Sequence, residues 1–163
     1  MEIRDARPGD AKALCAVINP HIAAGGSTAH RRPFDAAWML EHYVAPPQIV
    51  CCTVAEEAGR VLGFQSLVLA DDPDDPLPEG WAVIASFVAE GQGGRGIGRA
   101  MFEHTGAAAR AAGVTAIDAT IRADNAAGLR YYAGLGFTDW DRLVGVPLGD
   151  GRPVDRIRKK FVF

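Results

Sequence analysis

The stretch EGQGGRGIGRAM, residues 90–101, decides how the rest of the chain is interpreted. It places five glycines between positions 91 and 98, directly after the apolar run WAVIASFVA (81–89) and directly before a helical pattern. Strand, glycine-rich loop and helix therefore form one unit. Successive backbone N–H groups at the start of such a helix can converge on an anion, and the helix dipole favours the negative charge. The sequence predicts that the amides of Gly93–Gly98 hold a phosphate.

Two glycine patterns overlap in this loop. Gly91, Gly93 and Gly96 form G-x-G-x-x-G, the dinucleotide fingerprint, which needs an acidic residue about 20 positions further on, and Asp118 stands near that spacing. This interpretation is disfavoured because the loop opens too late in the chain for a doubly wound sheet and because Asp118 falls inside the strand pattern AIDATI. No Gly-Lys-Ser/Thr follows, which excludes a P-loop. The second pattern, R-G-x-G at Arg95–Gly98, is favoured over both and over a merely tight turn.

Length and composition are those of one average globular domain. The chain has 163 residues, 48% hydrophobic and 23% charged, so a single domain over 1–163 is expected. A net charge of -3, with basic clusters only at 31–32 and 156–160, disfavours a nucleic-acid partner. Without an apolar leader or a membrane-length apolar run, we expect a cytoplasmic protein with no membrane partner. Three residues are interpreted as small fillers rather than reactive thiols: Cys15, Cys51 and Cys52.

Hydrophobic periodicity predicts a mixed α/β fold. A helix is expected over 10–18, begun by Asp10 as its N-cap and ended or kinked by Pro20, and a second helix begins at Asp35. Runs rich in Val, Ile, Thr and Phe on either side of Ala58-Gly59 predict an antiparallel hairpin. The order of elements indicates helices on both faces of a largely antiparallel sheet. The remaining expected elements are strands over 81–89, 114–121, 137–144 and 154–163, and helices over 97–112 and 125–135.

Two segments together resemble the signature of one enzyme family. RGIGRAMF (95–102) is followed by NAAGLRYYAGLGF (125–137), and this pair resembles the GNAT acyl-CoA-dependent N-acetyltransferases. The opening IRDARPGD (3–10) resembles the family's first strand and helix start, so the resemblance covers the whole chain. The closing GVPLGDGRPVDRIRKKF (145–161) is similar to the phosphinothricin-acetyltransferase-like branch, which acetylates small amines such as amino-acid analogues. The resemblance implies a central sheet of about seven strands.

The resemblance also implies how acetyl-CoA binds as the acyl donor. No metal is expected, because the four histidines are isolated from Cys, Asp or Glu at ligand spacing. Main-chain groups of Phe87 and Val88 would meet the pantetheine arm, the glycine loop would hold the pyrophosphate, and Asn125 would contact the arm. Gly93 stands where the family usually has Arg or Gln, and Val83 where the branch often has a glutamate base, so this chain lacks both side chains. The expected cofactor-binding residues are Phe87, Val88, Gly93, Gly94, Arg95, Gly96, Ile97, Gly98, Arg99 and Asn125.

Acetyl transfer to an amine needs a free nitrogen lone pair, a polarised thioester carbonyl and a proton for the departing thiolate. Tyr132 is the expected general acid because of its place in the second signature segment; ordinary core packing beside Tyr131 is the alternative. Glu79, His30 and Asp118 are candidates for a base or water relay, although each type of residue is more often a solvated or structurally bonded group than a catalyst. The residues expected at the acceptor pocket are Thr28, His30, Trp81 and Phe87.

These inferences combine into one functional hypothesis with two rivals. The hypothesis is a homodimeric N-acetyltransferase that moves an acetyl group from acetyl-CoA directly to the primary amine of a small molecule, an amino acid or an analogue. The rivals are a protein or peptide N-acetyltransferase and a non-catalytic acyl-CoA-binding module. The absence of a carboxylate at Val83 supports the module, and Tyr132 opposes it. The acidic linker over 70–80 is expected to be an exposed connection, with attraction of a cationic substrate as the alternative.

Overall fold

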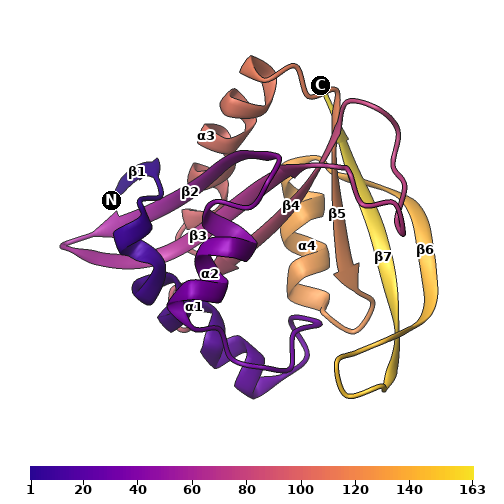
Figure 1. The fold of residues 1–163 in the computed structure, drawn as a ribbon, viewed down its shortest axis with the longest axis horizontal. Coiled ribbons are helices and arrows are strands. Elements are labelled where there is room, and N and C mark those ends of the chain that lie inside the picture. The colour runs from indigo at the N-terminus through magenta and orange to yellow at the C-terminus, as the bar shows by residue number, and fades with distance from the viewer.

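The computed structural model describes residues 1–163 as one seven-stranded sheet with helices on both faces (Figure 1). The strand order is β1-β2-β3-β4-β5-β7-β6, and all neighbours are antiparallel except β4 and β5. This arrangement confirms the predicted mixed α/β class. The strands are β1 (Glu2–Asp5), β2 (Ile49–Glu57), β3 (Arg60–Leu69), β4 (Trp81–Val88), β5 (Ala116–Arg122), β6 (Thr138–Pro147) and β7 (Pro153–Val162).

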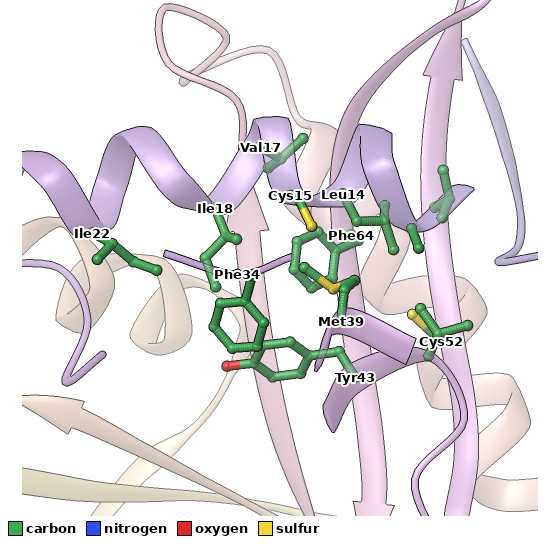
Figure 2. Close-up of a cluster of buried hydrophobic side chains, with 13 residues drawn as sticks. Leu14, Cys15, Val17, Ile18, Ile22, Phe34, Met39, Tyr43, Cys52 and Phe64 are labelled. Carbon is green, nitrogen blue, oxygen red and sulfur yellow. The ribbon is translucent and has the colours of Figure 1, made fainter. Parts of the chain in front are cut away.

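The two faces of the sheet carry separate apolar clusters. One cluster joins the first helices to β2 and β3 around Phe64, as Figure 2 shows, and the other lies beneath the last two helices. The neighbours Cys51 and Cys52 belong one to each cluster, because successive side chains of a strand point to opposite faces. The helices are α1 (Ala11–Ala24), α2 (Ala36–Met39), continued by the π-helical turn η2 (Leu40–Val44), α3 (Ile97–Ala111) and α4 (Ala126–Leu135).

β4 and β5 pair only at their beginnings. Their parallel register runs from Trp81 opposite Ala116 to Val83 opposite Asp118, and beyond it the strands diverge, with α4 visible between them in Figure 1. The rest of β4 is therefore paired with β3 alone. We call the space between the diverging halves the gap.

The alternation of β4 determines which backbone groups face the gap. The Ala70 N–H donates to the Trp81 C=O at 3.0 Å, and the Ala89 N–H donates to the Leu62 C=O at 2.8 Å, so odd-numbered residues of this strand bond to β3. Because main-chain groups alternate along an antiparallel pair, the even-numbered residues turn theirs the other way. The N–H and C=O groups of Ser86 and Val88 therefore point into the gap.

The first helix differs from its prediction at both ends. It continues through Pro20 to Ala24 rather than ending there, because burial of Ile22 and a bond from the His21 ring to β4 hold its last turn in place. The Asp10 carboxylate does not cap the helix. It accepts instead from the Arg7 N–H at 2.7 Å, within the 3₁₀ turn η1 (Pro8–Asp10), and is paired with Arg4.

Two other local predictions are confirmed. Asp35 caps α2 by accepting from the Trp38 N–H at 2.8 Å. The β2–β3 hairpin turns at Ala58 and Gly59, whose φ angles of 50° and 74° give the turn geometry that suits two-residue hairpins. None of the helices is both long and apolar enough to cross a membrane.

Candidate functional site

The glycine loop leaves an open concave backbone at the start of α3. Gly94 and Gly96 have φ angles of 77° and 76°, a region that favours glycine, and Gly96 is the N-cap without any side-chain cap. The first N–H groups of the helix have no partner one turn earlier. A Cβ placed on Gly93, Gly94 or Gly96 would meet no atom within 4 Å. The loop therefore offers free amide donors and room for an anion beside them.

The arginines of this loop are occupied by protein partners. Arg95 pairs with Glu57 at 3.0 Å, and Arg99 donates to the Gly134 C=O at 2.7 Å. Their side chains brace the loop against the β2–β3 hairpin and against the end of α4. With both side chains engaged and no basic side chain at position 93, the groups that the loop leaves open are main-chain amides.

A buried network fixes the first turn of α3. The Tyr131 hydroxyl donates to the Gly98 C=O at 2.9 Å and accepts from Gln65 Nε2 at 2.6 Å. Gln65 is fully buried, and its Oε1 accepts from the Thr105 hydroxyl at 2.9 Å. Burial raises the pKa of Tyr131 to about 12, so the phenol stays protonated. The network locks α3 and α4 to β3 and makes Tyr131 a structural residue.

Tyr132 lies at the gap itself. Its hydroxyl donates to the Ser86 Oγ at 3.0 Å, and only 7% of the residue is exposed. Burial raises the pKa of Tyr132, so the phenol keeps its proton throughout the neutral range. Tyr131 and Tyr132 thus direct their hydroxyls to different partners, one at the glycine loop and the other on β4. The arrangement can deliver a proton to an atom in the gap.

The end of β4 supplies backbone groups unequally. The Phe87 C=O lies over β3, where a Cβ on Gly63 would come within 2.8 Å of it, so the main chain of Phe87 does not face the gap as expected. Ser86 and Val88 face it instead. The Val88 C=O already accepts from His21 Nε2 at 2.7 Å. The main-chain groups of Ser86, rather than those of Phe87, are therefore open toward the gap.

Asn125 begins α4 and ties it to the loop that follows α1. Its Oδ1 accepts from the Gly128 N–H at 3.0 Å, and its Nδ2 donates to the Ser27 C=O at 3.4 Å. A Cβ on Gly128 would lie 2.5 Å from that Nδ2, so a larger residue there would displace the amide. Asn125 is held at the mouth of the gap, where its side chain positions α4.

Three of the four residues expected at the acceptor pocket gather on one side of the gap. His30 Nε2 is 2.8 Å from the Tyr43 hydroxyl, which lies at the edge of the apolar cluster in Figure 2, and the Phe87 ring is 5.9 Å from that of Tyr43. Thr28 is buried two residues before His30. Trp81 does not join them: it packs on Trp140 at the paired end of β4, roughly 20 Å along the strand from Phe87.

The candidate bases differ in what surrounds them. Asp118 is fully buried and satisfied by Arg158 at 3.0 Å and by the Trp140 indole at 2.9 Å, which makes it structural. Glu79 is exposed in the linker near the paired end of β4. Burial, with His42 and Arg156, lowers the pKa of His30 to about 4, so its imidazole is neutral. Of the three candidates, His30 alone lies beside the gap in its basic form.

Two cavities of about 590 Å³ adjoin this region. One lies over β3 and β4, where Val83 is 37% exposed, and its rim carries Glu41 and three linker aspartates, Asp71, Asp72 and Asp75. The other lies between the end of α1 and the end of β5, and its polar lining is Arg31, Arg122, Asp124 and Arg152. The acidic linker is thus part of a cavity wall as well as an exposed connection.

Residues 20–137 match the acetyltransferase (GNAT) family. The chain belongs to this family. Its fold matches a ribosomal-protein-alanine N-acetyltransferase from Brucella melitensis over 100% of both chains, with 25% identity and a TM-score of 0.84. YncA, a proposed acetyltransferase from Salmonella typhimurium solved with its cofactor acetyl-CoA, is similar over 99% of this chain and 93% of its own, with 25% identity and a TM-score of 0.78.

A third similar structure is assigned as a phosphinothricin N-acetyltransferase; it covers 99% of this chain and 97% of its own, with 22% identity and a TM-score of 0.82, and shows the shared fold. No curated protein matches the sequence. This GNAT chain is an acetyltransferase, and acetyl-CoA is the donor of its family. The open amides at Gly94 and Gly96 and the unpaired edge of β4 fit the pyrophosphate and the amide-bearing arm of that donor.

Sequence reasoning missed several residues that the fold brings to the site. Ser86 was not identified, although its side chain points to the face of β4 opposite that of Phe87, as neighbouring residues of a strand do. His21 and Gln65 act through contacts with distant segments, and no local pattern signals them. Arg156 was visible only as a charged residue inside the 154–163 strand pattern, and Arg122 follows directly after the 114–121 pattern, although it belongs to β5.

Proposed function

We propose that this GNAT protein moves the acetyl group of acetyl-CoA directly to the primary amine of a small molecule, an amino acid or an analogue, with Tyr132 as general acid. The observation that carries the proposal is the bond from the Tyr132 hydroxyl to Ser86, a residue whose main chain lines the gap. A protonated phenol at the unpaired edge of β4 stands between the glycine loop and the His30 side of the sheet.

The donor is held mainly by backbone in this proposal. The amides of Gly93 to Gly98 bind the pyrophosphate, and the Ser86 main-chain groups and the Val88 N–H pair with the amides of the pantetheine arm as an added strand would. When bound, acetyl-CoA supplies a thioester carbonyl that an amine can attack. Asn125 caps α4, and the bond from Tyr132 to Ser86 joins this helix to β4.

Proton movement involves one residue on the donor side. As the C–N bond forms and the C–S bond breaks, the thiolate takes the proton of the Tyr132 hydroxyl, whose pKa burial raises so that it is protonated beforehand. The acylated nitrogen releases its own proton to water, and a proton from water restores the phenol. No carboxylate stands at Val83, so the amine reaches the gap as the free base or loses its proton to water. His30, neutral and bound to Tyr43, is the imidazole that can order such a water.

A small acceptor is favoured over a polypeptide by the loop that follows α1. Ser27 is bonded to Asn125, Thr28 accepts from Arg122 at 3.0 Å, and Arg31 is paired with Asp150 at 3.0 Å. These contacts bridge the open end of the gap on the acceptor side. A polypeptide acceptor, such as the ribosomal-protein alanine in the name of the Brucella relative, would need this bridge to open.

The test is acetyl-CoA turnover on a panel of acceptors, read as release of the free thiol. The panel pairs L-amino acids and short diamines with hexapeptides that begin with alanine or serine. Turnover of free amino acids well above that of peptides supports the proposal. Faster turnover of peptides selects the polypeptide rival, and tight acetyl-CoA binding without turnover of any amine selects the non-catalytic module.

We further propose that the protein is a homodimer. Val162 and Phe163, at the end of β7, are 62% and 37% exposed, which is unusual for large apolar side chains at the end of a sheet strand. Light scattering at micromolar concentration should give twice the mass of 17.3 kDa. A monomer mass would contradict this part of the proposal.

A further inference from the structure

Three arginines share one face of the paired strands β5 and β7. Arg156 stands directly opposite Arg122, and Arg158 follows two residues later on the same face. This is the face covered by the loop after α1, because Arg122 donates to the Thr28 C=O at 3.0 Å. Arg122 lies on β5, which borders the gap, and β5 is the one strand between the gap and the two arginines of β7.

Two of the three arginines form ion pairs with aspartates of the protein. The Arg122 side chain is 3% exposed and binds both carboxylate oxygens of Asp124, at 2.9 and 2.7 Å. The Arg158 side chain is also 3% exposed and pairs with Asp118 at 3.0 Å and Asp75 at 2.7 Å. Each of these buried charges has a counter-charge, which is the usual condition for burying an arginine.

Arg156 lacks any such partner. Its guanidinium makes no ion pair, and its Nε is buried without a hydrogen bond. The charged groups around it are Arg122, which repels it, and Asp75, which is already held by Arg158. His30 faces it from the loop layer and is neutral. A half-buried cation beside a like charge costs free energy that a bound anion would offset.

We propose that Arg156 binds the carboxylate of the acceptor, so that the substrate is an amino acid; this inference rests on the acetyl transfer proposed above. The planar guanidinium can hold a carboxylate through two parallel hydrogen bonds. The bound acid lies under His30 on the acceptor side of the sheet, with its amine directed across β5 into the gap. Arg156 is then a specificity-determining residue for the acceptor.

The neighbouring cavity supports an anionic ligand on this side. Arg31, Arg122 and Arg152 line it; Asp150 pairs with Arg31 and Asp124 with Arg122, which leaves the charge of Arg152 without a counter-charge. A concave surface with an excess of one charge raises the local concentration of ligands with the opposite charge. The glycine loop, in contrast, belongs to α3 on the other face of the sheet, so the anion at Arg156 is the acceptor's and not a phosphate of the donor.

The experiment compares amino acids with their primary amides, which lack the carboxylate charge and carry a less basic amine, so rates are compared per free-base amine. Arg156→Gln is expected to lower kcat/KM for the acids by roughly 10- to 100-fold, mainly through KM, and to leave the amides unchanged. Arg156→Lys should restore part of the preference. Arg60→Gln, which removes an exposed arginine at the hairpin, is the matched control and should change neither substrate class.

Two binding measurements complete the test. Calorimetry should give the same acetyl-CoA affinity for Arg156→Gln and the parent; a weaker affinity would assign Arg156 to the donor and overturn the proposal. With CoA present, N-acetyl amino acids should bind the parent more tightly than their amides, and Arg156→Gln should erase that difference. The melting temperature of Arg156→Gln should equal or exceed that of the parent, because an unmatched cation is removed.

Several outcomes would contradict the proposed role of Arg156 and leave the proposed acetyl transfer intact. Equal turnover of acids and amides by the parent would overturn the carboxylate assignment while confirming the enzyme. An equal loss on both classes in Arg156→Gln, or a lower melting temperature, would make the residue structural. If no amine is acetylated, the proposed function fails, and the binding difference between N-acetyl amino acids and their amides still decides the role of Arg156.

Discussion

Tyr131 closes over Gly98. Its hydroxyl donates to the Gly98 C=O at 2.9 Å, and a Cβ on this glycine would lie 2.5 Å from the Cε2 of the ring. The tyrosine beside the proposed general acid therefore fits against the first turn of the helix that holds the donor's phosphates. Donor binding and placement of the acid are mechanically joined through this contact.

The first prediction concerns that contact. Gly98→Ala should destabilise the protein by about 1–3 kcal/mol, because the ring must move and its buried hydrogen bonds with it. Acetyl-CoA affinity should fall too, since the loop moves with α3. Gly134→Ala, in α4 with nothing within 4 Å of the added methyl, is the control and should be neutral or slightly stabilising. Equal urea midpoints for the two variants would show that Tyr131 does not constrain position 98.

A second prediction tests the phosphate-binding amides. Gly96→Val should weaken acetyl-CoA binding by about 1–3 kcal/mol, because the side chain fills the open space beside the loop and strains a residue with φ of 76°. Gly91→Val carries the same strain, with φ of 75° and no neighbour within 4 Å, outside the proposed contact. Calorimetry should separate them. Matching affinities would mean that strain, and not lost phosphate contact, explains any effect.

Much of the fold could be predicted because its signals are local. The turn at Ala58-Gly59, the cap at Asp35 and the glycine loop before α3 depend on residues close in sequence. The divergence of β4 from β5 could not be predicted, since it depends on pairing between segments more than 30 residues apart. Pro20 failed as a stop signal because contacts made by the following turn outweigh the lost hydrogen bond.

The site was predicted less completely for a related reason. Trp81 and Phe87 are both bulky and share one face of β4, but they lie near opposite ends of the strand. The phase that turns Ser86 and not Phe87 to the gap is set by β3. Arg156 and Arg158 look alike in sequence, and only the distant Asp75 and Asp118 distinguish them.

A third prediction follows from the neutral His30. Its folded-state pKa of about 4 lies below the ordinary value, so the unfolded chain takes up a proton that the folded protein does not. Stability is therefore fully present above about pH 6.5 and is lost as the pH falls toward 4. His30→Gln should flatten the fall in melting temperature over this range. Tyr43→Phe removes the same hydrogen bond but keeps the imidazole, so it should retain the parent's slope; a parent-like slope in His30→Gln would exclude this histidine as the source.

The last prediction separates the two adjacent tyrosines. Tyr132→Phe keeps the buried ring and deletes the proton near Ser86, so turnover on an accepted amine should fall roughly 10²- to 10⁴-fold with acetyl-CoA affinity nearly unchanged. Tyr131→Phe should keep most activity, because Gln65 also donates to the Gly98 C=O, at 3.2 Å, and should cost about 1 kcal/mol of stability. Ser86→Ala should retain the acid and most of the rate. Parent-like turnover by Tyr132→Phe, or a loss confined to Tyr131→Phe, would assign the proton to another group.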